Sequence, residues 1–259
     1  MKILTTLLLF PLSLFAFYTG NPFSPTLLQK GFFALYNSLA SVGVGYLGDY
    51  VSDKQLLLKE RDTINFEKVN HFKMESQMSY LSLILVRRME IYSYLGVSKE
   101  KMEWEPLVEN NAPDELKANN HFSYAVGAKA ILLEFSSAAF SIDVNYFCLP
   151  SSEKVKEKLQ SLAFPFSLGN QTLKWKEWNF SLGLAGKLGP LTPYFGGKYS
   201  TAKLKVSSTN SSDILRFTGK EHWGIFAGIS INISKTLYLT GEWRHFDENA
   251  LSASAVFAF

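Results

Sequence analysis

The sequence has little cysteine and no large excess of positive or negative charge. Its single cysteine, Cys148, excludes an intramolecular disulfide framework. The 26 Lys and Arg residues and 23 Asp and Glu residues give a formal net charge of +3, which is too small and too scattered to indicate nucleic-acid binding. After the N-terminus no apolar run approaches the about 20 residues that a membrane-spanning helix needs. These absences leave two classes, an exported soluble protein and a membrane β-barrel.

The N-terminal segment has the pattern of a secretion signal. Lys2 precedes an apolar run over residues 3–17, and Ala16 is a small residue at the expected cleavage point. The run is too short to span a bilayer. We therefore expect a cleaved signal peptide over residues 1–16 and a mature chain that starts near Phe17.

Aromatic residues and period-two alternation are abundant. The chain has 21 Phe, 12 Tyr and 5 Trp, which suits aromatic girdles at two membrane interfaces. Apolar and polar or small residues alternate over residues 223–233, and the last nine residues place Phe257 and Phe259 on an apolar face opposite Ser252. A soluble β-protein can also stop inside an edge strand. Outer-membrane barrels, however, present such a terminal aromatic strand to their assembly machinery, so we interpret Phe257 and Phe259 as a barrel-assembly signal.

The connections between the alternating segments follow a rhythm of short and long. About ten segments of about 8 to 16 residues exceed the usual strands of soluble sheets and suit tilted membrane spans. Short links are expected near residues 86–87, 135–137, 189–191 and 234–236, and long polar ones near residues 53–73, 99–118, 149–173 and 208–218. A barrel with short periplasmic turns and long external loops requires this rhythm.

We therefore predict an all-β fold, a transmembrane antiparallel β-barrel in the bacterial outer membrane. Residues 41–259 form this barrel, with about ten strands and twelve as the upper possibility. Residues 17–40 form a periplasmic lead-in or a lumen segment, in which residues 25–39 could make a short helix that plugs or props the lumen. Residues 151–159 are expected by default to form a solvated charged loop, although a serine that precedes glutamates at capping spacing could start a short helix there.

Charged residues recur on the strand faces opposite the lipid. A Lys or Arg on the lipid face at the midplane costs about 2 to 4 kcal/mol, so these side chains must face water or each other. The functional interpretation is a polar conduit with weak ion selectivity. The structural interpretation is a mesh of ion pairs that fills a narrow lumen. The lumen-facing candidates are Asp49, Arg88, Glu90, Lys129, Asp143, Glu177, Lys187, Lys198, Glu242 and Arg244.

The four histidines raise the question of catalysis. His71, His121, His222 and His245 are expected near the outer rim, where the carboxylates are Asp49, Asp53, Asp213 and Asp247. A histidine with a carboxylate partner can act as a general base, whereas rim residues at the headgroup level are often simply polar. No GxSxG, HExxH or paired CxxC motif accompanies them, so neither a serine hydrolase nor a zinc site is supported. We predict no enzyme, no metal and no cofactor.

Several stretches resemble one known family in the same order. SVGVGYLGDY over residues 41–50 resembles the first conserved strand of the chlamydial major outer membrane proteins, and GNPFSP over residues 20–25 resembles the start of their mature chain. Similar stretches begin at Arg87, Phe122 and Glu177, and the last is LTGEWRHFDENALSASAVFAF at the C-terminus. This chain is shorter and has one cysteine where that family is cysteine-rich, so a disulfide-linked envelope role is not carried over. The resemblance implies a porin-like surface protein of a chlamydia-related bacterium.

The expected function is passive diffusion of small polar solutes or ions, together with a contribution to envelope structure. Two alternatives stay open, a closed structural barrel and an adhesin that acts through external loops 99–118 and 149–173, while a rim-located hydrolase is less favoured. The expected partners are the lipid bilayer with its lipopolysaccharide and the outer-membrane assembly machinery. A homo-oligomer and a host surface are open partners, and nucleic acid is not expected.

Overall fold

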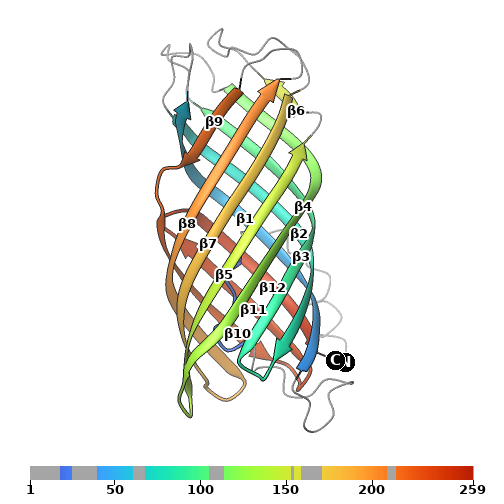
Figure 1. The fold of residues 1–259 in the computed structure, drawn as a ribbon, viewed down its shortest axis with the longest axis vertical. Helices are drawn as coiled ribbons and strands as arrows, with labels where there is room; N and C mark the ends of the chain where they lie inside the picture. The colour runs from blue at the N-terminus through green and yellow to red at the C-terminus, as the bar shows by residue number, and fades with distance from the viewer. Residues whose placement is uncertain are drawn as a thin grey trace, which may run out of the picture.

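The protein is described by a computed structural model over residues 18–24, 40–60, 68–104, 114–152, 155–158, 171–208 and 214–258. Twelve strands form one antiparallel sheet that closes into a tall barrel of tilted strands (Figure 1). Among the described residues no helix is long and apolar enough to cross a membrane. The expected signal peptide, the expected helix over residues 25–39 and Phe259 lie outside the described residues.

The strands differ in length, and two of them are short. Their bounds are β1 Ala40–Glu60, β2 Lys68–Leu85, β3 Met89–Trp104, β4 Asp114–Glu134, β5 Ala138–Ser152, β6 Val155–Lys158, β7 Gln171–Gly186, β8 Leu191–Ser208, β9 Ile214–Gly219, β10 Trp223–Asn232, β11 Leu237–His245 and β12 Asn249–Ala258.

Ring closure depends on β1, which pairs with both β2 and β12. At the level of residues 43–53 of β1, the ring contains all strands except β6 and β9, which confirms the prediction of ten strands. Above that level, β1 pairs with a different strand on one of its sides. Residues 56–60 of β1 pair with β9, and β9 also pairs with residues 203–207 of β8. One strand thus takes the place of β10, β11 and β12, and the ring narrows from ten strands to eight.

The short turns gather at one end of the barrel, as predicted. They lie at residues 86–88, 135–137, 187–190 and 233–236. Val86 and Arg87 both have positive φ, and the N–H of Arg88 donates to the carbonyl of Leu85. Two successive residues with positive φ form a tight turn that joins one strand directly to its antiparallel neighbour. With the predicted orientation, this end faces the periplasm.

The long connections are shorter than predicted, because strands extend into every segment that was assigned to a loop. β1 continues to Glu60, β3 continues to Trp104, and β8 continues to Ser208. The solvated loop expected for residues 151–159 and the short helix considered there are both wrong over residues 155–158, since β6 is a strand that pairs with residues 115–118 of β4. In these extensions the outward side chains are charged while inward ones such as Met102 and Leu116 are buried. These extensions are polar on average, so they were predicted as loops. Their side chains nevertheless keep alternating between outward and inward positions beyond the membrane.

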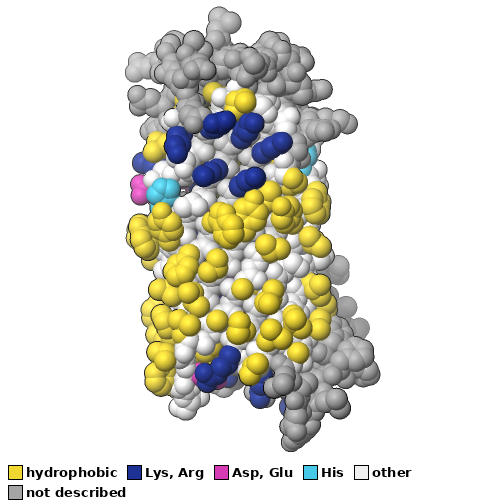
Figure 2. Space-filling view, in the orientation of Figure 1, with side chains coloured by type: hydrophobic (Ala, Val, Ile, Leu, Met, Phe, Trp, Pro, Cys, Tyr) yellow, Lys and Arg dark blue, Asp and Glu magenta, His cyan; other side chains and the backbone are white. Residues whose placement is uncertain are grey.

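The outer surface carries a broad hydrophobic band (Figure 2). On β7, Trp178, Phe180 and Leu182 are between 39% and 57% exposed, and on β12 Leu251 and Phe257 point outward while the serines between them are buried. The apolar face expected for the last strand is therefore confirmed. A closed sheet satisfies its own backbone hydrogen bonds, as the hydrocarbon region requires. With this band, the chain is an outer-membrane β-barrel.

A charge placed inside the band should destabilise the barrel according to its depth. We expect Leu182→Arg to lower the free energy of unfolding by about 2 to 4 kcal/mol, because the guanidinium would face lipid near the midplane. Thr201→Arg is the matched control, since Thr201 stands opposite Trp178 at the upper edge of the band, where the cost should be about 0 to 1 kcal/mol. Equilibrium urea unfolding in lipid vesicles measures both, and equal costs would contradict the assigned band.

Candidate functional site in the barrel lumen

The lumen concentrates buried charge. Among the described residues four cationic side chains are buried inside the barrel, and they are Lys54, Lys129, Lys198 and Arg244. Eight carboxylates of the same described segments are buried as well, and they are Asp49, Glu90, Glu100, Asp143, Glu177, Glu242, Asp247 and Glu248. Buried charges are retained only when they are paired or hydrogen-bonded, so the arrangement of these groups decides what the lumen can do.

Two lysines lie among three carboxylates at the top of the ten-strand ring. The Nζ of Lys54 is 2.6 Å from Oε1 of Glu177 and 3.2 Å from Oε2 of Glu248. The Nζ of Lys198 is 2.5 Å from Oε1 of Glu248 and 2.9 Å from Oδ2 of Asp247. Ser200 also donates to Asp247. Oxygens of Glu177, Asp247 and Glu248 come close enough together to hold a metal ion, but the two ammonium groups already supply the positive charge.

Arg244 extends this cluster toward the middle of the lumen. Its Nε lies 2.8 Å from Oε1 of Glu248, and its terminal nitrogens lie 3.4 Å from Oε1 of Glu242 and 3.5 Å from Oδ1 of Asp49. The pairs come from β1, β7, β8 and β11 and from the turn after β11. We call these eight side chains the lumen ion network. Its members are Asp49, Lys54, Glu177, Lys198, Glu242, Arg244, Asp247 and Glu248.

An apolar layer lies above the network, where the ring has eight strands. The indole N–H of Trp175 donates to Glu177, and its ring stacks on Phe72 with centroids 4.5 Å apart. The buried inward side chains at this level include Leu56, Val69, Phe72, Met102, Leu116, Leu173, Trp175, Leu204, Val206, Leu215 and Phe217. An eight-strand barrel is just wide enough for its own side chains to fill. We refer to these residues as the apolar cap.

Residues 18–24 run inside the lumen below the network (Figure 1). The backbone N–H groups of Thr19 and Gly20 donate to the two carboxylate oxygens of Glu242, at 2.9 and 3.0 Å. The side chain of Asn21 donates to Ser230 at 2.7 Å.

The segment is held at its other end too. The hydroxyl of Ser24 donates to Glu90, and the Nζ of Lys129 donates to the carbonyl of Asn21 at 3.3 Å. Beside Ser24 and Lys129, a cavity of about 10 Å³ remains, which has room for about one water molecule. The segment therefore occupies the cross-section that a solute would need.

The structure buries eight of the ten predicted lumen residues. Lys187 instead lies at the periplasmic mouth, with its Nζ 4.4 Å from the ring centroid of Phe23. The placement of Arg88 is a correction: β3 begins only at Met89, so Arg88 belongs to the turn, is exposed, and lies 3.6 Å from Glu134. Whether the buried eight conduct solutes stays a prediction.

Sequence reasoning missed three members of the network. Lys54 fell in a segment assigned to a loop, although the buried Lys54 and Leu56 on either side of the exposed Gln55 continue the period of two. Asp247 and Glu248 follow Phe246, whose φ is +78°. The left-handed backbone conformation of Phe246 turns the chain inward at the end of β11, and the alternation of residues in the sequence does not predict such a turn.

The histidines do not share one site. His71 lies 3.0 Å from Asp53 on the outer surface, where its side chain is 54% exposed. His245 stacks on Trp243, and His222 contacts the carbonyl of Ser200. The carboxylates expected beside them are elsewhere: Asp49 and Asp247 belong to the lumen ion network, and Asp213 lies outside the described residues.

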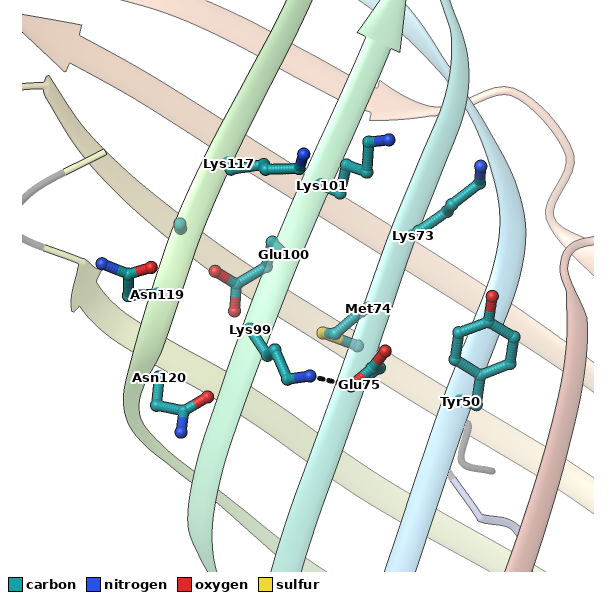
Figure 3. Close-up of a pocket in the computed structure, with 11 residues that line it drawn as sticks. Tyr50, Lys73, Met74, Glu75, Lys99, Glu100, Lys101, Lys117, Asn119 and Asn120 are labelled. Carbon is teal, nitrogen blue, oxygen red and sulfur yellow. Dashed lines mark ion pairs between the residues drawn. The ribbon is translucent and has the colours of Figure 1, made fainter. Parts of the chain in front are cut away.

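A surface hollow of about 660 Å³ lies on the outer face of β1 to β4 (Figure 3). Lys73, Lys101 and Lys117 form one row across three strands, and Lys99 pairs with Glu75 below them. A bulge in β4 places Asn119 and Asn120 opposite Lys99. Most charges that border the hollow are paired, whereas the buried Glu100 that also lines it has no hydrogen-bond partner for either carboxylate oxygen among the described residues. None of the residues that line the hollow belongs to the lumen ion network.

Breaking the network from one side should be costly. We expect Lys54→Met to lower the free energy of unfolding by about 3 to 5 kcal/mol, because it leaves buried carboxylates uncompensated. Lys73→Met is the control, since Lys73 forms a more exposed pair with Glu103, and such pairs contribute about 0 to 1 kcal/mol. Urea unfolding in vesicles compares them. If the two variants lose the same stability, the network is not a buried electrostatic unit.

Comparison with known proteins finds similarity in sequence and in structure. No protein-family model matches the sequence. The chain is similar to the "Major outer membrane porin" of Chlamydia psittaci, with 24% identity over 78% of this chain and 75% of that protein. Among solved structures, the outer membrane protease OmpT from Escherichia coli matches 88% of this chain and 99% of its own at 10% identity, with a TM-score of 0.43. An outer membrane channel from Pseudomonas putida F1 matches 89% and 99% at 12% identity, with a TM-score of 0.41.

Proposed function

We propose that this protein is a closed structural barrel of the outer membrane, which carries an eight-strand extension and external loops on the cell surface. The observation that carries the proposal is the filling of the lumen at three successive levels. Residues 18–24 occupy the lower half, the lumen ion network crosses the middle, and the apolar cap fills the narrowed top. Its sequence suggests a shortened, cysteine-poor relative of the chlamydial major outer membrane proteins.

Each level opposes conduction for a different physical reason. The lower segment excludes solutes by volume, because Asn21 and Ser24 bridge opposite walls. The network holds its charges in pairs, so a passing ion would have to displace an ammonium from a carboxylate. The only polar side-chain group of the apolar cap, the indole N–H of Trp175, already donates to Glu177, so nothing in the cap replaces the hydration shell of an ion and desolvation there is expensive.

Passive diffusion is the second candidate, and the sequence relative named as a porin favours it. Residues 18–24 are held in part by hydrogen bonds to Glu242, Ser230 and Glu90, which water can replace when the segment leaves. The buried carboxylates outnumber the buried cations, so a pore opened in this way would favour cations.

A role without catalysis is part of the proposal. The exposed pair of His71 and Asp53 lies on the outer wall, apart from the lumen. The assembly machinery remains a proposed partner through Phe257 and Phe259. A homo-oligomer and a host surface remain open partners of the external face.

Planar-bilayer conductance tests the two candidates directly. We expect the refolded protein to give no stepwise conductance, and we expect the same of a variant that lacks Tyr18–Ser24, because the network and the apolar cap remain. Heat-modified migration on gels and circular dichroism establish that both proteins are folded.

Steps in the unaltered protein would overturn the closed barrel and support diffusion. Steps that arise only after deletion of Tyr18–Ser24 would also overturn it, and would identify this segment as the gate of a pore. In either case, Glu242→Gln should then weaken the preference for cations.

A further inference from the structure

We propose that the outer face of β7, β8 and β9 binds the phosphate groups of lipopolysaccharide. The site consists of five outward basic side chains, which we call the β7–β9 basic patch: Lys174, Lys176, Lys203, Lys205 and Arg216. Figure 2 shows Lys and Arg side chains gathered directly above the hydrophobic band on this face.

Strand register stacks these cations in two rows. Lys174 stands opposite Lys205, and Lys205 stands opposite Arg216, so one row crosses three strands. Lys176 stands opposite Lys203 in the row below. Neighbouring strands lie about 4.8 Å apart and successive outward residues about 7 Å apart. Like charges directly opposite one another destabilise a sheet, so the four lysines would be stabilised by anions from outside the barrel.

The opposite wall shows how the same fold neutralises such a row internally. Lys73, Lys101 and Lys117 also stand opposite one another across β2, β3 and β4. Glu103 pairs with Lys73 and Lys101, and Glu115 pairs with Lys101 and Lys117. Hydrogen bonds from Lys101 lower the pKa of Glu103, and those from Lys117 lower the pKa of Glu115, so both carboxylates stay charged.

The four lysines of the β7–β9 basic patch have no such outward carboxylates on the described part of their own strands, whereas Arg216 stands opposite Glu60 of β1. The described outward positions of β7 and β8 carry no Asp or Glu. Within the described part of the chain, none of the four lysines forms an ion pair, and Lys174 and Lys203 are exposed. Two walls of one barrel thus carry matching rows of lysine, and among the described residues only the lysines of β2 to β4 are paired with carboxylates of their own wall.

The position of the patch selects the ligand. Trp178 is outward and 57% exposed two residues below Lys176, and Tyr199 and Trp223 pack edge to face beside it on the next strands. Aromatic side chains of this kind mark the level of the membrane interface. The basic rows therefore lie at headgroup height on the external side. The phosphorylated headgroups of that leaflet belong to lipopolysaccharide, and Lys and Arg near an anionic membrane surface gain affinity from it.

Binding of lipopolysaccharide to the refolded, full-length mature protein in zwitterionic detergent tests the proposal. The variant Lys174→Gln/Lys176→Gln/Lys203→Gln/Lys205→Gln should lose at least tenfold in affinity, measured by microscale thermophoresis and native mass spectrometry. The control Lys73→Gln/Lys99→Gln/Lys101→Gln/Lys117→Gln removes the same formal charge from the opposite wall and should change affinity less than threefold. Heat-modified migration confirms that each variant is folded.

Three further probes identify the source of the phosphate. Dephosphorylated lipopolysaccharide should lose at least tenfold in affinity for the unaltered protein, inorganic phosphate should compete only weakly, and phosphatidylglycerol vesicles should bind less tightly. Equal losses in the patch variant and the control would overturn the proposal, because net charge alone would then account for binding. Equal affinity for phosphatidylglycerol would overturn it as well, because the patch would then attract any anionic lipid surface.

Discussion

Closure of the sheet is the constraint on which the rest of the structure depends. In hydrocarbon every backbone N–H and C=O must find its partner within the protein, and the pairing of β1 with β12 leaves no open edge at that level. Closure forces each strand to divide its side chains between lipid and lumen. Ten strands enclose a narrow interior, so the polar side chains kept from the lipid meet one another there. The lumen ion network follows from that geometry.

Where the barrel leaves the membrane, the polar side chains face outward and the apolar ones face inward, which is the reverse of the arrangement inside the bilayer. Inside the bilayer, Leu182 and Phe180 face outward while Ser181 and Asn179 are buried. Beyond Trp178 the same strand turns Lys174 and Lys176 outward and Leu173 and Trp175 inward. The replacement of three strands by β9 narrows the ring at this level. A narrower ring in water is best filled with apolar side chains, as in a soluble barrel, and the apolar cap is the result.

The sequence predicted most of this arrangement wherever the alternation was uninterrupted. Glu242 and Arg244 were assigned to the lumen because they alternate with outward residues along one strand. Arg88 was wrongly assigned to the lumen because it belongs to the turn, and the strand begins only one residue later, at Met89. Lys54 was missed because charged outward residues made the extensions resemble loops, and Asp247 was missed because a single left-handed residue, Phe246, redirects the chain. Strand faces are local properties, whereas a narrowing ring depends on pairing between distant segments.

The polar lumen is better explained by specificity than by stability. Moving ions from water into a protein interior costs several kcal/mol each, and a well-packed apolar filling is often as stable as a buried ion pair. An apolar filling would make both faces of each strand alike, however. A strand with two apolar faces can slip by one residue without penalty, because its side chains exchange sides without changing their environment. With Glu242 and Arg244 on one face, a slip of one residue would expose both to lipid, at about 2 to 4 kcal/mol for the arginine alone. The buried charges thus fix the register on which ring closure depends.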